Sequence, residues 1–205
     1  MNFSLNELLV MVPAFVIAIA CHEASHALAA TLLGDPSPKS AGRLSLNPLR
    51  HLDPLGTITL FLMGFGWGKP VFVNPRNFRV NPRAGMALVA FAGPLSNLLL
   101  ALLFALPFRM HILMSRELLT LAAAIASINL LLAVFNLIPL PPLDGFSVLL
   151  GILPRPMAAS IAPLAQYGPA ALLGLFALSY VFKVSVLGII MNPAYQLLQP
   201  LVFGR

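Results

Sequence analysis

Two histidines and a glutamate stand at the spacing of a zinc site in the first apolar segment. The motif His22-Glu23-x-x-His26 lies inside an apolar run of residues 8–33. Side chains four residues apart project from the same face of a helix, so the two imidazoles can share one metal ion. Glu23 follows the first histidine directly and can accept a proton from a water molecule. This arrangement is typical of metal-assisted hydrolysis.

A catalytic zinc site usually has three protein ligands and one open position, so a third ligand is needed. Among the remaining acidic residues, Asp144 follows the third apolar segment and is expected near the depth of the histidines. Its alternative role is that of a turn residue before Gly145. The other candidates are distant or belong to loops: Glu7, Asp35, Asp53 and Glu117.

Charge balance favours Asp144 as the third ligand. A zinc ion, two neutral imidazoles and the carboxylates of Asp144 and Glu23 sum to zero. A neutral cluster avoids most of the solvation penalty of an isolated ion in a low-dielectric site. The alternative is a helix in which a carboxylate merely bonds two buried histidines. Glu23 at membrane depth costs about 2.5 to 3.5 kcal/mol, and such an intramembrane residue indicates function.

The composition predicts an integral membrane protein. Of 205 residues, 59% are hydrophobic and 9% charged, whereas soluble domains have about 25% charged residues. The apolar runs are continuous and do not alternate, which favours helices over a barrel. We expect one membrane-embedded domain over residues 1–205, with a core at 8–150 and C-terminal helices at 157–205.

The basic residues predict the orientation in the membrane. The net charge is +6, and many Lys and Arg residues gather at 37–83. By the positive-inside rule this loop is cytoplasmic, the N-terminus is outside, and the zinc motif lies in the cytoplasmic half of a multi-pass protein of the cell membrane. No basic stripe with interleaved aromatics is present, so no nucleic-acid partner is expected. Because the first 38 residues lack Lys and Arg, we expect no cleaved secretory signal.

The segments predict an all-α polytopic bundle of four to five spans. The last apolar run either spans or returns halfway, and the third segment must open at the prolines that follow it. Breaks are expected at Gly93-Pro94 and at Asn192-Pro193. The apolar segments are 7–33, 85–108, 118–138, 158–182 and 184–203.

A small re-entrant element resembling a β-hairpin is expected between the first two spans. Residues 43–47 and 71–74 are bounded by prolines and predict short strands. Residues 55–65 are apolar but too short to cross a bilayer. The strands offer an edge on which an unwound substrate could pair through its main chain.

Three motifs together resemble the site-2 protease family of intramembrane zinc metalloproteases. They are His22-Glu23-x-x-His26, the run from Asn136-Leu137-Ile138-Pro139 to Leu143-Asp144-Gly145, and Gly93-Pro94-x-x-Asn97. The resemblance covers residues 8–150.

The resemblance implies one Zn²⁺ per chain, bound by His22, His26 and Asp144, with Glu23 as the catalytic base. It implies cleavage of a transmembrane protein substrate near the cytoplasmic face, with Asn136 holding the substrate strand. We expect a compact member without a PDZ or CBS domain. The alternative function is a membrane zinc-binding or transport protein without hydrolysis, and a third is a noncatalytic scaffold.

Four further residues have open roles. Asn97 could bond a ligand histidine or join two helices. His51 with Asp53 could form a second metal site, although an ordinary loop pair in a basic, partly exposed stretch is favoured. Cys21 has no disulfide partner in the chain and is expected as a small buried side chain, with a metal role as the alternative. The oligomeric state is left open.

Overall fold

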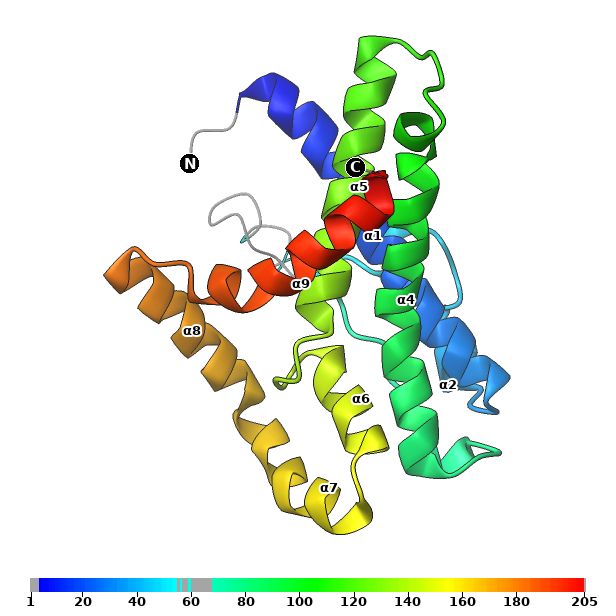
Figure 1. The fold of residues 1–205 in the computed structure, drawn as a ribbon. Coiled ribbons are helices and arrows are strands. Elements are labelled where there is room, and N and C mark those ends of the chain that lie inside the picture. Colours follow the sequence, from blue (N-terminus) through cyan, green and yellow to red (C-terminus); the bar gives the residue numbers. More distant parts are fainter. Residues whose placement is uncertain (1–3, 55, 57–58, 60–67, 205) are drawn as a thin grey trace.

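Three long helices pack side by side and form the centre of the molecule. The computed structural model describes residues 4–54, 56, 59 and 68–204. Helices α1 (Leu5–Leu32), α4 (Pro82–Arg109) and α5 (Arg116–Asn136) contact one another pairwise (Figure 1). The all-α architecture expected from the continuous apolar runs is confirmed.

Local sequence explains where α1 begins and how it packs. The backbone N–H of Ser4 donates to the Glu7 carboxylate over 2.8 Å, and the N–H of Glu7 donates to the Ser4 hydroxyl over 3.3 Å. This capping box satisfies backbone donors at the start of the helix. Four small side chains of α1 are fully buried and let neighbouring parts of the fold approach closely: Ala14, Ala18, Ala27 and Ala30.

Helix α4 runs without a break through Gly93 and Pro94, so the expected interruption is wrong. Proline is tolerated in membrane helices because neighbouring groups can satisfy the carbonyl that it leaves free. Helix α9 likewise continues through Asn192-Pro193. A proline in an apolar helix therefore marked no boundary here.

The prolines at 139–142 do end α5, as expected. The chain turns there and begins α6 (Asp144–Ile152) at the third predicted ligand. The elements that follow are α7 (Arg155–Ile161), η3 (Ala162–Tyr167), α8 (Gly168–Phe182) and α9 (Val186–Phe203).

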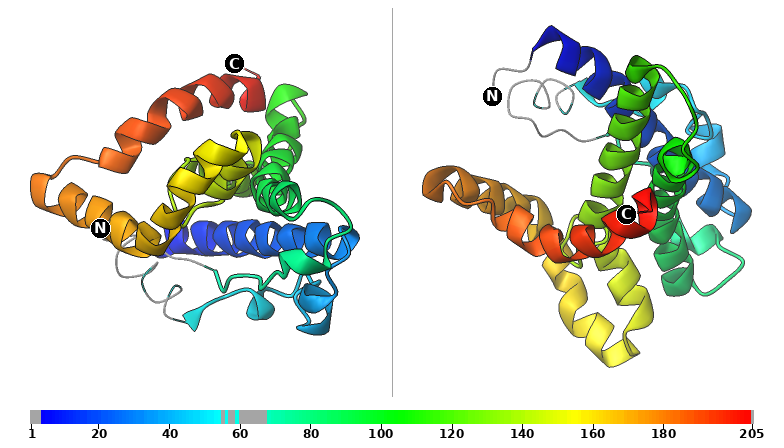
Figure 2. Two further views of the ribbon diagram at one scale, coloured as in Figure 1. Left: turned by 90° about the horizontal axis from the view of Figure 1, so that it is seen from below. Right: turned by 45° about the horizontal axis from the view of Figure 1, so that its top comes forward.

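Helices α8 and α9 form a V at the periphery, and α9 returns to the central bundle (Figure 2). The Arg109 guanidinium at the end of α4 donates to the carbonyls of Leu201 and Val202 in the last turn of α9. This cation lies where the helix dipole is negative, which favours the contact.

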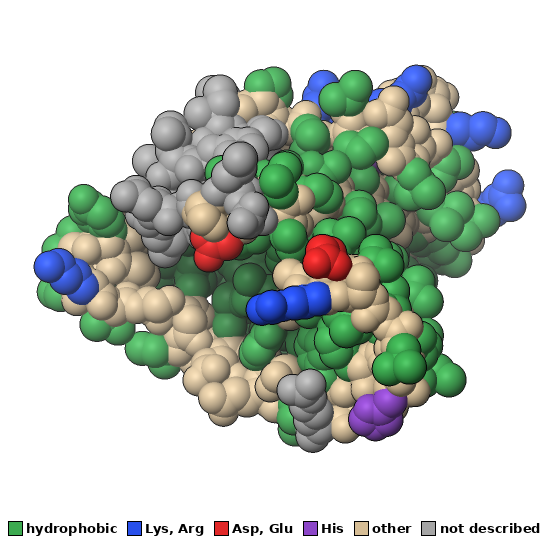
Figure 3. Space-filling model, turned by 90° about the horizontal axis from the view of Figure 1, so that it is seen from above, with side chains coloured by type: hydrophobic (Ala, Val, Ile, Leu, Met, Phe, Trp, Pro, Cys, Tyr) green, Lys and Arg blue, Asp and Glu red, His purple; other side chains and the backbone are tan. Residues whose placement is uncertain are grey.

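Among the described residues, five helical stretches are long and apolar enough to cross a membrane, within the predicted range of four to five. They are Glu7–Leu32, Pro82–Arg109, Arg116–Asn136, Arg155–Phe182 and Val186–Phe203. Seen from above, the surface is mostly hydrophobic, with several Lys and Arg side chains gathered at one edge (Figure 3). The protein is therefore a multi-pass membrane protein.

The connection between α1 and α4 is irregular where strands were expected. It contains α2 (Ser37–Ser40), η1 (Pro48–Arg50) and η2 (Pro75–Asn77). Residues 43–47 and 71–74 form no strand, and within the described part of this connection only Leu52 and Gly68 form an isolated bridge. The strand prediction is wrong, because neither stretch pairs with a neighbouring strand among the described residues. The apolar stretch 55–65 lies outside the described residues, apart from Gly56 and Thr59.

Candidate metal centre

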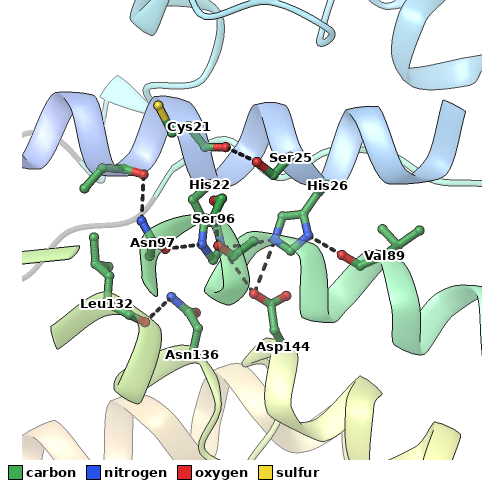
Figure 4. Close-up of polar contacts among 12 residues, drawn as sticks. Cys21, His22, Ser25, His26, Val89, Ser96, Asn97, Leu132, Asn136 and Asp144 are labelled. Atoms are coloured by element: carbon green, nitrogen blue, oxygen red, sulfur yellow. Dashed lines mark hydrogen bonds and ion pairs between the residues drawn. The ribbon is translucent and has the colours of Figure 1, made fainter. Parts of the chain in front are cut away.

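Three potential ligand atoms meet between α1 and the start of α6. His22 Nε2 and His26 Nε2 lie 3.1 and 3.2 Å from Asp144 Oδ2, and 3.0 Å from each other (Figure 4). Both histidines are buried, and Asp144 is partly buried. The structure therefore brings the three predicted ligands together.

The spacing of these atoms fits a zinc ion. Ligand atoms about 2.0 to 2.2 Å from zinc in a tetrahedral arrangement are about 3.3 to 3.6 Å from one another. The observed separations of 3.0 to 3.2 Å are close to the lower end of that range. Two nitrogens and one carboxylate oxygen also match the donor set of a catalytic zinc site with one open position.

Hydrogen bonds on the far side of each imidazole fix its tautomer. His26 Nδ1 donates to the Val89 carbonyl over 2.7 Å, and His22 Nδ1 donates to Asn97 Oδ1 over 2.6 Å. In its neutral form each ring therefore has a lone pair on Nε2. The two lone pairs and the Asp144 carboxylate oxygen converge on one point. A divalent cation bound there would satisfy all three.

The orientation of Asn97 is itself fixed by two further bonds. Its amide nitrogen donates to the Ala18 carbonyl over 3.1 Å and to Asn129 Oδ1 over 2.8 Å. Both amide hydrogens are used, so the amide oxygen has to face His22. Asn97 thus both supports a ligand histidine and joins α1, α4 and α5, which were the two roles left open by the sequence.

Helix α4 approaches the histidines closely enough to require glycine. A Cβ atom on Gly93 would lie 2.5 Å from His26 Nε2 and 2.6 Å from His22 Cε1. Gly145 is equally constrained, because its Cβ would lie 2.3 Å from the Leu137 carbonyl oxygen. These two glycines explain why the second and third motifs contain Gly at these positions.

A cavity of about 430 Å³ opens onto the ligand atoms. Glu23 and Asn136 line it together with the extended segment 70–73. Asn136 Nδ2 donates to the Leu132 carbonyl on its own helix over 3.1 Å. The proposed base and the proposed substrate-binding residue thus face the space in which a substrate would lie.

The other candidate residues lie apart from this group of ligands. His51 is fully buried rather than partly exposed, and its ring bonds the Ser45 carbonyl over 2.6 Å. Within the described ranges, His22, His26 and Asp144 are the only group of three or more metal-ligating side chains. Cys21 is half-buried and lines a separate apolar cavity with Leu44.

Fold and site together define a polytopic helical membrane protein with a metal centre inside its bundle. The chain belongs to peptidase family M50, and the resemblance to site-2 proteases is confirmed. The model of that family matches residues 107–176.

Two similar proteins carry related descriptions. "Putative zinc metalloprotease YwhC" of Bacillus subtilis is 39% identical over 174 residues, which cover 81% of this chain and 79% of that protein. "Putative zinc metalloprotease Rip2" of Mycobacterium tuberculosis is 31% identical over 170 residues, covering 81% of this chain and 66% of that protein. No solved structure matches the chain significantly.

Proposed function

We propose that this protein is an intramembrane zinc endopeptidase in which His22, His26 and Asp144 hold one Zn²⁺ and Glu23 is the base. The convergence of two Nε2 atoms and one carboxylate oxygen within 3.2 Å carries the proposal. Membership of a peptidase family supports hydrolysis as the reaction.

The residues of the cavity have separate roles in peptide hydrolysis. When bound, zinc supplies Lewis-acid chemistry that activates water and polarises the scissile carbonyl. Glu23 accepts the proton of the attacking water and passes it to the leaving amine. Asn136 uses one amide hydrogen on Leu132, so its second amide hydrogen is left to donate to the substrate carbonyl.

The substrate class is a transmembrane segment of another protein. A helical substrate has its carbonyls engaged in its own hydrogen bonds and has to unwind before attack. The extended segment 71–73 lines the cavity, and none of the hydrogen bonds seen among the described residues involves its main chain. An unwound substrate can therefore pair with this segment by strand addition.

The orientation follows from the distribution of charge. We place the metal centre in the cytoplasmic half of the cell membrane, with the basic connection between α1 and α4 on the cytoplasmic side. Cysteines introduced singly at Lys39 and at His111 should react with an impermeant thiol reagent from opposite sides of the membrane.

The substitution Glu23→Gln tests the activity. Purified wild-type protein should cleave a single-span reporter whose transmembrane segment carries an Asn-Gly pair near its cytoplasmic end. The variant should keep one zinc per chain but lose at least about 100-fold in rate, because the carboxamide cannot accept the proton. Zinc transport into vesicles that survives in the variant, without any cleavage by the wild type, would instead identify a transporter.

A further inference from the structure

The Asp35 carboxylate is buried at the C-terminal end of α1, where a negative charge is unfavourable. Its side chain is fully inaccessible, and its backbone N–H closes the end of α1 by donating to the Ala30 carbonyl over 3.0 Å. The C-terminus of a helix carries partial negative charge, which disfavours a nearby anion. A charge buried there is retained only if strong hydrogen bonds satisfy it.

Four donors satisfy this carboxylate. Ser37 is local and donates to Oδ1 from its backbone N–H over 3.1 Å and from its hydroxyl over 2.7 Å. The other two come from the far end of the connection to α4. The Asn74 backbone N–H donates to Oδ2 over 2.7 Å, and Asn77 Nδ2 donates to Oδ1 over 2.8 Å. Asp35 thus ties the end of α1 to a segment about 40 residues later.

The segment held by Asn74 is the one that lines the metal cavity. Residues 70–73 precede Asn74 directly and face the cavity with the metal ligands. At the other end of the segment, the Lys69 N–H donates to the His51 carbonyl over 2.6 Å. Residues 70–73 are therefore anchored at both ends. Lys69 and the Arg43 guanidinium, which donates to the Pro70 carbonyl over 3.4 Å, hold one end, and Asp35 holds the other through Asn74.

The same helix carries this anchor and two metal ligands. His22 and His26 project from α1, and Asp35 lies just beyond its end. Gly34 allows the segment to lie against this end, since a Cβ there would lie 2.9 Å from the Asn77 carbonyl oxygen. Segment 70–73 is therefore held in a fixed position relative to α1, the helix that carries His22 and His26.

We propose that Asp35 is a positioning residue that sets the register of segment 71–73 against the metal centre, and so determines which peptide bond of a paired substrate is cleaved. This inference rests on the proposed protease function. Asp35 touches neither substrate nor metal and acts through the Asn74 N–H and the Asn77 amide together.

The substitution Asp35→Asn tests it, with Ser37→Ala as the matched control. An amide has one acceptor oxygen, so its NH₂ group must face either the Asn74 N–H or the donors at Oδ1. Ser37→Ala removes one bond to the same carboxylate but leaves both anchors of the cavity segment. Each protein is assayed with the single-span reporter for zinc content, KM, kcat and, by mass spectrometry, the position of the cut.

Asp35→Asn should keep one zinc per chain, raise KM about tenfold or more, and spread the cut over neighbouring peptide bonds. Ser37→Ala should cut at the wild-type bond with wild-type KM. If both variants cut the same single bond with the same KM, the inference is overturned. A lack of cleavage by the wild type would instead overturn the proposed function.

Asn77→Ala provides the test should Asp35→Asn fail to fold. This change deletes only the 2.8 Å bond from Asn77 to Asp35 and leaves the buried carboxylate with three donors. A raised KM and a second cleavage position support the positioning role. An unchanged KM and a single cut, as in Ser37→Ala, reject it.

Discussion

Asn97 determines which nitrogen of His22 is available to a metal. Its oxygen accepts the Nδ1 proton over 2.6 Å and leaves the Nε2 lone pair directed at Asp144. Partners of this kind are commonly worth 10- to 100-fold in metal affinity. Asn97 is also fully buried, so its loss leaves the imidazole N–H without an acceptor.

Asn97→Ala should therefore weaken zinc binding by about 10- to 100-fold. Competition with a chromogenic chelator measures this change. The neighbouring Ser96→Ala is the control, because the Ser96 hydroxyl bonds only the Gly93 carbonyl of its own helix, over 2.7 Å. Equal zinc affinity in the two variants would contradict the role assigned to Asn97.

Asp35 makes the fold sensitive to acid. Burial alone raises the pKa of Asp35, but the hydrogen bonds from Asn74, Asn77 and Ser37 outweigh it and hold the pKa below its ordinary value. A lowered pKa stabilises the fold above the unfolded-state pKa of about 3.9, and this contribution is lost as the pH falls through the folded-state pKa.

The stability gap between wild type and Asp35→Asn should accordingly be constant near neutral pH and shrink below about pH 4. Denaturant unfolding in detergent at several pH values measures the gap. A gap that widened on acidification would contradict the lowered pKa.

At the scale of residues, the sequence predicted which three potential ligands meet but not their environment. The spacing of His22 and His26 is a property of one helix, so it could be recognised directly. Asp35 was assigned to a surface or turn because its partners Asn74 and Asn77 are remote in sequence. His51 was expected to be partly exposed for the same reason, and it is fully buried.

The approach of α4 to α1 depends on one missing side chain. Gly93 lies against both imidazoles, and a Cβ there would come within 2.6 Å of their ring atoms. The rings are held by hydrogen bonds on their far sides, so they cannot move without losing those bonds.

Gly93→Ala should reduce zinc occupancy and lower the unfolding temperature. Gly174→Ala is the matched control, because this glycine is also helical and a Cβ there meets nothing within 4 Å. The control should change stability by no more than about 1 kcal/mol. Zinc content and unfolding temperature are measured for both variants. Full zinc occupancy in Gly93→Ala would contradict the close contact between Gly93 and the imidazoles.

At the scale of elements, hydropathy predicted the spans well and proline predicted their ends poorly. The prolines that begin at residue 139 follow the end of α5 at Asn136, whereas Pro94 lies inside α4. The difference lies in packing against neighbouring helices, which a single sequence does not show. The two expected strands failed because β-propensity without a pairing partner does not make a ladder.

A metal bound at the predicted site would connect parts of the chain that are distant in sequence. Its predicted ligands lie in α1 and at the first residue of α6, so a bound ion would join these two helices. An ion that binds only the folded protein stabilises it by about 2.7 kcal/mol at a concentration 100 times its Kd.

Chelation should therefore lower the unfolding temperature of the wild-type protein in detergent. The variant Asp144→Ala retains both histidines but lacks the ligand from α6, so chelator should shift its unfolding temperature much less. Differential scanning fluorimetry with and without chelator measures both shifts. Equal shifts would show that the ion does not connect α1 with α6.

Asn129 contacts His22 only indirectly, through Asn97. By accepting one amide hydrogen of Asn97, it keeps that amide from rotating and presenting NH₂ to His22. The Asn129 amide is oriented in turn by its 2.9 Å bond to the Ile125 carbonyl. A change in α5 that contacts neither imidazole can thus exchange the protonated and the free nitrogen of His22, and a sequence variant there would present as a defect in metal loading.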